Sequence, residues 1–324
     1  MQRTYYDLAG LEVLRDKKPL LVAGSSFAAF NIEFPCEMLR FKDFQPNPLY
    51  EDIEVGVRML KDNSCDFIVA VGGGSCIDTA KGIKYYSELN LPVMVIPTTA
   101  GSGSEATRYS IIYKEGKKLT ITDDNLLPDY VILDAYFLTT LPLYQRKCTM
   151  LDALCQAIES WWSKSSTSES IKYSQEAISL ILKNKDGYLR NEAEGNEMML
   201  RGANLSGQAI NVTTTTAPHT MCYKLTSLYN LPHGHAVALC LPKVWAQMGG
   251  FAEIAESLGQ KTTKEGVTFL EDLFAELEIT APSTASIADL DILTEAVDTN
   301  RLANHPVWLD QDTIRELYRQ ILKL

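Results

Sequence analysis

The first 140 or so residues of the chain alternate short apolar runs with amphipathic stretches. The apolar runs, which end in glycine or lead into glycine-rich loops, cover residues 19–24, 65–75 and 92–105. The amphipathic stretches cover residues 48–63 and 77–89. Short apolar runs alternating with helices are typical of buried parallel strands, so the pattern predicts βαβ units. A further strand is expected at 130–134, and the preceding segment 117–124 is a candidate hairpin strand.

The pattern changes near Leu141. Long segments with helical periodicity follow, at 150–162, 170–184 and 197–210, and β-rich runs almost vanish. Pro142 lies at this change and is consistent with a domain boundary there. We therefore predict an α/β dinucleotide-binding domain over residues 1–141 and an all-α, metal- and substrate-binding domain over residues 142–324. A cleft between two such domains is a common place for a small-molecule site.

Composition narrows the class of protein. A length of 324 residues favours two domains, and 46% hydrophobic with 22% charged residues is ordinary for a globular protein. A net charge of -11 argues against nucleic-acid binding. No apolar run approaches the length of a membrane span, and the N-terminus lacks the pattern of a signal peptide. Seven cysteines without a CxxC pair favour reduced thiols, so we expect a soluble, cytoplasmic protein.

Two glycine-rich loops follow predicted strands. The first, GGGS at 72–75, precedes a helix with Asp78 in its first turn, where free backbone N–H groups and the helix dipole favour an anion. The second, PTTAGSGSE at 97–105, offers threonine and serine hydroxyls. One such loop is often only a tight connection. Two at the carboxyl ends of parallel strands indicate a nucleotide with two phosphates, although neither matches GxGxxG or a Walker loop.

Three of the four histidines, His219, His233 and His235, lie within residues 215–242. Such histidines can be satisfied core residues, a proton relay or metal ligands. Asp152 lies in an apolar helical segment, where a carboxylate is costly unless it is paired or binds a cation. One carboxylate and two imidazoles form a ligand set with an open position, so Asp152, His219 and His233 are predicted to bind one metal. Gln156 lies one turn beyond Asp152, and His235 is expected behind the ligands or on the surface.

Five segments together carry a family resemblance: GGGSCIDTAKG, PTTAGSGSE, KKLTITDDNLLPDYVILD, LDALCQAIES and PHTMCYKLTSLYNLPHGHA. In this order they resemble the iron-containing alcohol dehydrogenase family, which includes glycerol dehydrogenase and is related to dehydroquinate synthase. The resemblance covers nearly the whole chain. It implies the dehydroquinate synthase-like fold, with the metal between an N-terminal dinucleotide-binding domain and a C-terminal helical domain.

Carried over by position, the resemblance implies a set of site residues. The residues expected beside NADH or NADPH are Gly24, Gly73, Gly74, Ser75, Asp78, Thr98, Thr99, Ser102, Ser104 and Lys118. The ligands of one divalent iron or zinc ion would be Asp152, His219 and His233, with Gln156 as a weak fourth. The residues expected to take part in catalysis are His233 and Tyr223.

Three positions depart from the family pattern. Many members carry histidine at the position of Gln156, and a neutral amide oxygen is a weaker ligand, so three-ligand binding is expected. Many members also carry histidine at the position of Tyr223, whose phenol can donate a proton or pack against the nicotinamide. Gly24 and the two serines after it lack the carboxylate that several members place there, so a 2′-phosphate is not repelled and NADPH stays open.

Within the family, the helix and histidine motifs resemble those of phosphonoacetaldehyde reductases, which form 2-hydroxyethylphosphonate. We therefore predict reduction of an aldehyde to a primary alcohol, with Lys224 or Arg108 binding a phosphonate. The alternatives are an alcohol or polyol dehydrogenase acting on a neutral substrate, a dehydroquinate synthase-like lyase, and a nucleotide-binding protein without turnover. A small-molecule substrate and a homodimer are expected, without nucleic-acid or membrane partners.

Overall fold

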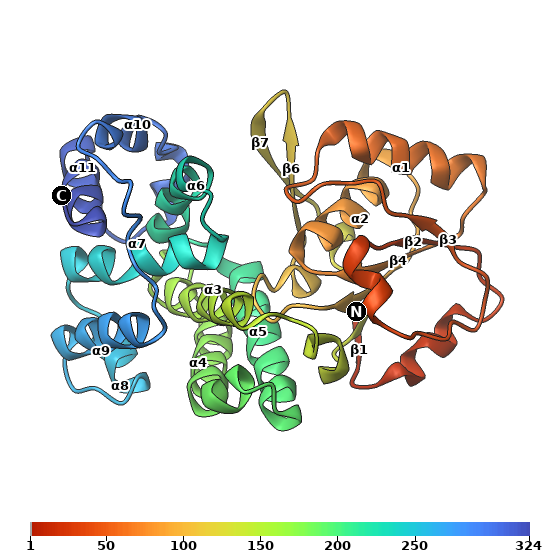
Figure 1. Cartoon of the computed structure of the whole chain (residues 1–324), viewed down its shortest axis with the longest axis horizontal. Coiled ribbons are helices and arrows are strands. Elements are labelled where there is room, and N and C mark those ends of the chain that lie inside the picture. The colour runs from red at the N-terminus through yellow and green to blue at the C-terminus, as the bar shows by residue number, and fades with distance from the viewer. Residues whose placement is uncertain (1) are drawn as a thin grey trace.

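The computed structural model describes residues 2–324 and consists of a half built on a sheet and a helical half (Figure 1). The strands are β1 (Arg3–Tyr5), β2 (Pro19–Val22), β3 (Leu39–Phe41), β4 (Phe67–Gly72), β5 (Val93–Pro97), β6 (Tyr109–Lys114), β7 (Lys117–Thr122) and β8 (Tyr130–Ile132). The α-helices are α1 (Tyr50–Asp62), α2 (Gly74–Ser87), α3 (Leu143–Trp162), α4 (Ser168–Leu189), α5 (Ala193–Thr213), α6 (Ala217–Tyr229), α7 (His233–Met248), α8 (Ala252–Ser257), α9 (Thr263–Glu276), α10 (Asp289–Glu295) and α11 (Gln311–Leu322). Short 3₁₀ helices are η1 (Leu8–Leu14), η2 (Ser25–Ala29), η3 (Ser104–Ala106), η4 (Asp124–Leu126), η5 (Ala135–Leu138) and η6 (Thr299–Asn304).

Six strands form one parallel sheet in the order β1-β8-β5-β4-β2-β3. Every residue of β4 is buried, and alternate side chains enter different cores. Ile68 packs on one face with residues from α1 and α2, whereas Phe67 and Val69 pack on the other. Burial on both faces explains why these strands are continuous apolar runs rather than alternating ones. The predicted fold class, α/β followed by all-α, is confirmed.

The sheet order brings the two glycine loops together. β4 and β5 are parallel neighbours in which Gly72 is paired with Pro97, so both strands end at the same edge. The Thr98 N–H donates to the Gly72 carbonyl at 3.1 Å and extends this pairing into the loops. The hairpin of β6 and β7 lies apart from the sheet and leans toward the helical half (Figure 1). The segment at 117–124 is therefore a hairpin strand, as predicted.

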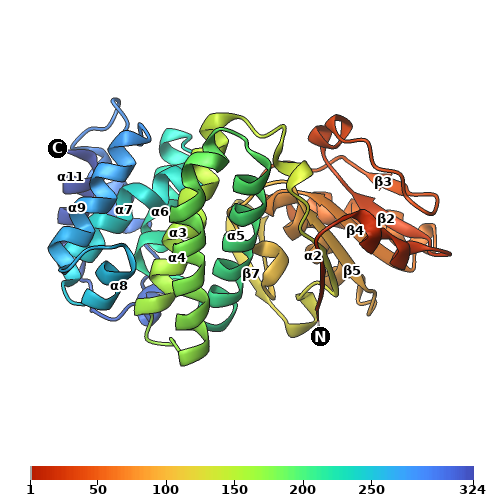
Figure 2. The ribbon, with the colours of Figure 1, turned by 90° about the horizontal axis from the view of Figure 1, so that it is seen from below.

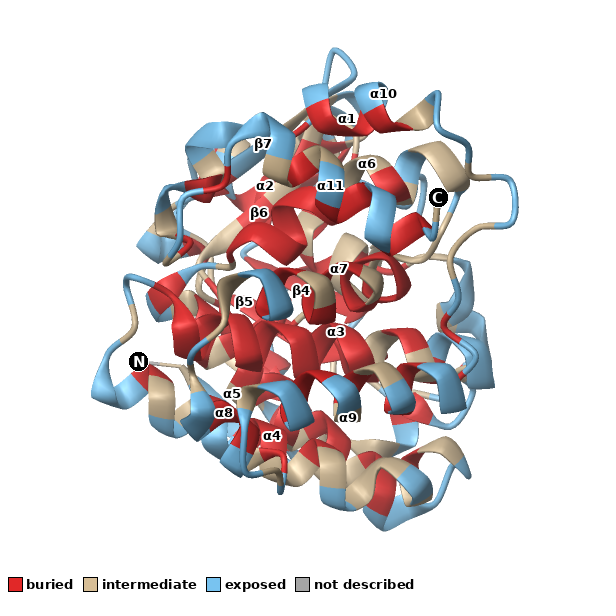
Figure 3. Ribbon diagram, turned by 90° about the vertical axis from the view of Figure 1, so that its left-hand side faces the viewer, coloured by how far each residue is buried: buried red, intermediate tan, exposed pale blue. Residues whose placement is uncertain are grey.

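Helix α3 is the central helix of the helical half and is buried along most of its length (Figure 3). It packs against α4, α5 and α7, and these helices form a bundle beside the sheet (Figure 2). Trp161 and Trp162 near its end belong to the core. His235 is also a core residue, because Tyr144 Oη and the Thr280 carbonyl lie 2.9 Å from its ring nitrogens. The expected place of His235, behind the ligands or on the surface, was wrong.

The structure bears on some of the remaining predictions and leaves others untested. Within residues 2–324, no helix combines the length and apolarity needed to cross a bilayer. All seven cysteines are free thiols, of which Cys36 is half-buried and the others are buried. The division into domains 1–141 and 142–324 stays a prediction, as do the homodimer and the cytoplasmic location.

Candidate active site

A cavity of about 630 Å³ lies between the two halves of the molecule. Most residues predicted from the sequence line it: Gly74, Ser75, Asp78, Thr99, Ser102, Ser104, Lys118, Asp152, Gln156, His219, Tyr223 and His233. Five predicted residues are not part of the lining: Gly24, Gly73, Thr98, Arg108 and Lys224. The fold therefore joins the second glycine loop, part of the first and the histidine segment in one space.

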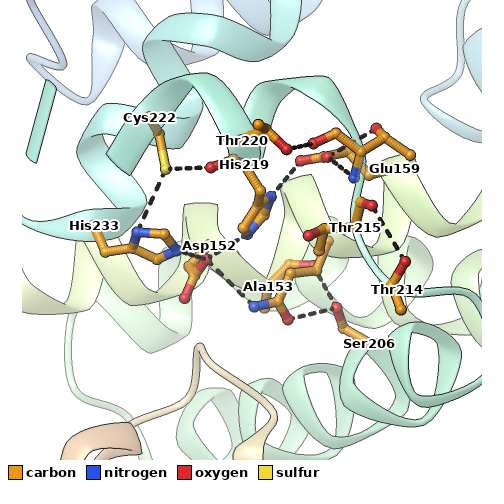
Figure 4. Close-up of polar contacts among 12 residues, drawn as sticks. Asp152, Ala153, Glu159, Ser206, Thr214, Thr215, His219, Thr220, Cys222 and His233 are labelled. Atoms are coloured by element: carbon orange, nitrogen blue, oxygen red, sulfur yellow. Dashed lines mark hydrogen bonds and ion pairs between the residues drawn. The ribbon is translucent and has the colours of Figure 1, made fainter. Parts of the chain in front are cut away.

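The candidate metal ligands come from three helices of the helical half (Figure 4). Asp152 lies on α3, His219 on α6 and His233 at the start of α7. One ligand atom from each lies within 4.8 Å of the others. The Asp152 Oδ1 atom is 3.3 Å from His219 Nε2 and 3.7 Å from His233 Nε2. Three converging donors, with the His233 side chain 39% exposed at the cavity, suit a metal with an open position.

Glu159 orients this cluster, and sequence analysis did not single it out. Its side chain is fully buried on α3, and one carboxylate oxygen is hydrogen-bonded to His219 Nδ1 (Figure 4). The other oxygen accepts from the Thr216 backbone N–H at 2.7 Å and from the Thr216 hydroxyl at 2.9 Å. A carboxylate on Nδ1 fixes the imidazole so that Nε2 faces the ligand cluster. The available signal was its position seven residues after Asp152, two turns along the same helix face.

The charges of the cluster fit a cation. Burial alone lowers the pKa of His219, but Glu159 and Asp152 outweigh burial and raise it to about 9. Burial lowers the pKa of His233, so this imidazole is neutral with a lone pair free for a ligand bond. Two buried carboxylates thus face one titratable imidazole, and a divalent ion can replace the His219 proton. The residues present fit a bound metal ion.

The side chain of Gln156 is not oriented as a metal ligand. Its side-chain nitrogen lies 3.4 Å from Asp152 Oδ1 and donates to the Ser102 carbonyl at 3.3 Å. Its oxygen lies 3.3 Å from the Ser206 hydroxyl, which donates to the Ala153 carbonyl at 2.8 Å. The nitrogen of Gln156, rather than the oxygen, faces Asp152, which favours a set of three ligands.

The two glycine loops contact each other closely. A Cβ atom on Gly74 would lie 2.9 Å from the Ser102 hydroxyl, so the glycine lets α2 approach the second loop without moving that side chain. Asp78 lies beyond the first turn of α2, so its predicted place was wrong, and it accepts from the Ser104 hydroxyl at 2.7 Å. The fully buried Lys81 ammonium donates to the Ser104 carbonyl at 2.6 Å and to two further carbonyls in residues 107–109. These bonds fix the loop beside the N-terminus of α2, where backbone N–H groups can bind phosphate.

Aromatic and cationic side chains meet beside the ligand cluster. The Tyr223 and His233 rings are stacked, with centroids 5.9 Å apart and planes 10° apart. Lys118 Nζ lies 3.1 Å from the Tyr223 ring centroid, and the Arg301 guanidinium carbon lies 5.4 Å from it. Arg301 was not predicted as a site residue. Arg108, a predicted substrate residue, instead pairs with Asp124 at 2.8 Å.

Comparisons with known proteins give the family. The family model for iron-containing alcohol dehydrogenases matches residues 9–135, and the model for the C-terminal part of Fe-containing alcohol dehydrogenases matches residues 147–322. The chain belongs to the iron-containing alcohol dehydrogenase family. The predicted oxidoreductase of the alcohol dehydrogenase type is thereby confirmed, while the resemblance to phosphonoacetaldehyde reductases stays a prediction.

Individual relatives agree with membership of the iron-containing alcohol dehydrogenase family. The chain is 30% identical to a 1,3-propanediol dehydrogenase of Citrobacter freundii over 87% of its own length and 81% of the relative. It is 26% identical to an NADPH-dependent butanol dehydrogenase of Clostridium saccharobutylicum, over 97% and 95% of the two chains. Its fold matches that of a sulfoacetaldehyde reductase of Bifidobacterium kashiwanohense, solved with NAD⁺, with a TM-score of 0.89, 23% identity and coverage of 99% and 96%.

The role of Glu159 can be tested through metal affinity. In Glu159→Gln, the side-chain amide cannot accept from both His219 and Thr216 as the carboxylate does. We expect metal affinity to fall by about 10- to 100-fold. Competition with a chelator of known affinity measures this change. Glu256→Gln, on the exposed side of α8, serves as the control. Equal metal affinity in both variants would contradict the orienting role.

Proposed function

We propose that this protein is a metal-dependent NAD(P)H-linked reductase that converts phosphonoacetaldehyde into 2-hydroxyethylphosphonate. The observation that supports it best is the cavity itself. One space joins a three-ligand cluster, two glycine loops suited to a dinucleotide, and two cations, Lys118 and Arg301. The ligand cluster suits a substrate carbonyl, the glycine loops suit the dinucleotide that donates the hydride, and Lys118 and Arg301 suit an anionic headgroup.

The glycine loops would hold the dinucleotide. Backbone N–H groups at the start of α2, with Gly74 and Ser75 in the cavity wall, suit the pyrophosphate. Thr99 and Ser102 offer hydroxyls beside it. The turn at Gly24 has no carboxylate to repel a 2′-phosphate, and the Arg40 guanidinium donates to the Gly24 carbonyl at 2.5 Å, so both NADH and NADPH are proposed. The butanol dehydrogenase relative is named for NADPH.

Asp152, His219 and His233 would hold one iron or zinc ion. When bound, the metal supplies Lewis-acid polarisation of a carbonyl, and the reduced nicotinamide supplies the hydride. Glu159 keeps the His219 ring in position for this task. The apolar core around α3 excludes water from the side of the cluster that faces away from the cavity.

Tyr223 is the proposed proton donor to the product oxygen. Its ring stacks on His233 at the cavity wall. Burial raises the pKa of the Tyr223 phenol, so it keeps its proton at neutral pH. Arg301 donates to the phenol oxygen at 3.5 Å, which orients the hydroxyl group. A phenol held in this way can pass its proton directly or through one water.

A neutral substrate is the second candidate. The relatives with the highest identity named above are dehydrogenases of 1,3-propanediol and butanol, which are uncharged alcohols. Arg301 and Lys118 in the cavity wall favour an anionic substrate instead, because a guanidinium and an ammonium offer charged donors that a neutral alcohol does not use.

Oxidation of NADH and NADPH by the purified protein tests the proposal. Phosphonoacetaldehyde is expected to be reduced with a kcat/KM at least about 10-fold above that of propanal, since binding energy from a charged headgroup can be used in the transition state. Chelation should remove turnover, and added iron or zinc should restore it. Full activity after verified metal removal would contradict the ligand assignment. Equal efficiency with propanal would favour the neutral substrate.

A further inference from the structure

We propose that Arg301, assisted by Lys118, is the residue that recognises the anionic end of the aldehyde. This inference rests on the proposed function and names the group that would give it specificity. It also replaces the two cations expected from sequence, Lys224 and Arg108, neither of which lines the cavity. Among the described residues of the cavity wall, Lys118 is the lysine and Arg301 is the arginine, and the two histidines belong to the candidate ligand cluster.

Arg301 reaches the cavity from η6, in the C-terminal part of the chain. Its Nη2 donates to the Thr120 hydroxyl at 2.9 Å, and its Nη1 donates to Tyr223 Oη at 3.5 Å. Asp298 lies 3.6 Å from its Nε. A guanidinium has five N–H donors in a planar fork, and neutral hydroxyls occupy part of it here. The fork therefore keeps donors for a tetrahedral oxyanion, which it binds better than a single ammonium does.

Lys118 supplies the second positive charge. Within residues 2–324, no carboxylate lies within 4.0 Å of its ammonium and no acceptor is hydrogen-bonded to it; its neighbour is the Tyr223 ring. Burial is the main cause that lowers the pKa of Lys118 to about 7, and the charge of Arg301 adds to it. The charge of Arg301 therefore disfavours the charged form of Lys118. An anion bound between the two side chains would favour that charged form and gain a second cationic partner.

The acidic groups of the cavity wall have their own hydrogen-bond partners, and the carboxylate paired with Arg301, Asp298, lies outside the wall. Asp78 accepts from the Ser104 hydroxyl, and Asp152 faces the two candidate ligand imidazoles. The wall thus has an acidic, imidazole-rich side and a cationic side. Tyr223 joins them, because its ring contacts Lys118 and stacks on His233. A molecule with a carbonyl at one end and an anion at the other matches this separation of charge.

The segment that carries Arg301 is fixed by its own hydrogen bonds. Asn304, at the end of η6, donates to the Thr213 carbonyl at 2.6 Å and to the Thr214 hydroxyl at 3.0 Å. Asp298 accepts from the Asn300 N–H at 3.0 Å and caps the start of η6. Both ends of this short element are therefore held, and the guanidinium loses little freedom when a ligand binds.

The test compares three aldehydes of similar shape on the metal- and cofactor-loaded enzyme. Phosphonoacetaldehyde and sulfoacetaldehyde carry anionic tetrahedral headgroups, and 3,3-dimethylbutanal carries a neutral one. In Arg301→Gln, kcat/KM for both anionic aldehydes is expected to fall by about 30- to 1000-fold. The value for 3,3-dimethylbutanal should fall much less, because the loss of the Arg301–Tyr223 contact is common to all three aldehydes and only the anionic ones also lose a charge–charge attraction. Arg315→Gln, which removes an exposed guanidinium paired with Asp291, is the matched control.

Calorimetric titration with ethylphosphonate gives a readout that needs no turnover. The wild type and Arg315→Gln are expected to bind it equally, and Arg301→Gln at least about 10-fold more weakly. An equal loss on all three aldehydes, or a change confined to the KM of NAD(P)H, would overturn the assignment of Arg301 to the substrate. Unchanged ethylphosphonate binding would overturn it too. A wild type that prefers 3,3-dimethylbutanal would instead refute the proposed function, whatever Arg301 does.

Discussion

Asp152→Asn is expected to leave the protein without bound metal and to lower aldehyde turnover by about 1000-fold or more. Asp152 is the anionic member of the ligand set, and its Oδ1 atom faces both imidazoles. Asparagine has nearly the same shape but no charge, so the two histidines would remain without a carboxylate between them. Loss of Lewis-acid polarisation then removes several kcal/mol of transition-state stabilisation.

Elemental analysis of the purified variant and its rate of NAD(P)H oxidation measure this effect. Asp272→Asn, an exposed aspartate on α9, is the control for the chemistry of the substitution. Thermal unfolding of both variants reports whether the fold persists. A full equivalent of metal in Asp152→Asn would show that the ion is held elsewhere.

Gly234→Ala is expected to lower the free energy of unfolding by about 3 kcal/mol or more, because it adds an atom where backbone already lies. Gly234 follows His233 at the start of α7, and a Cβ atom there would lie 1.9 Å from the Cys148 carbonyl oxygen and 3.1 Å from Asp152 Cβ. Neither α3 nor α7 can move without displacing a candidate ligand. Metal affinity should therefore fall together with stability.

Denaturant unfolding and chelator competition measure the two effects. Gly202→Ala makes the same change in another buried helix contact, where the nearest atom is a side-chain carbon of Ile181 at 3.0 Å. That side chain can shift, and alanine favours the helix, so its effect should stay within about 1 kcal/mol. Similar stability losses in the two variants would mean that the α3–α7 contact has no special rigidity.

Much of the fold could be predicted from local patterns. The buried strands β2, β4 and β5 are continuous apolar runs, and the helices α3, α4 and α5 have clear periodicity. The edge strands β1 and β3 were missed because they are mostly exposed or half-buried and have no apolar run, whereas β8, of the same length, lies inside the sheet and was predicted. Their pairing at the sheet edges depends on contacts far along the chain, as does the strand order.

Some residues of the candidate site could likewise be predicted from the sequence, and others could not. The residues with chemically unusual settings, such as Asp152 in an apolar helix, could be found from the sequence. Arg301 could not, because it lies in a polar segment without periodicity and reaches the cavity only through the anchoring of Asn304. Lys224 and Arg108 were predicted as anion-binding residues from nearness in sequence to motifs, which does not determine the direction of a side chain.

All three candidate ligands, and the glutamate that orients one of them, belong to the helical half, whereas the glycine loops belong to the sheet half. A change in the angle between the halves would therefore carry the ligand cluster along intact. Product and dinucleotide could leave at every cycle while the ion stays in place. The same arrangement lets cofactor preference and metal binding evolve separately, because substitutions in the glycine loops that change cofactor preference need not disturb the metal ligands.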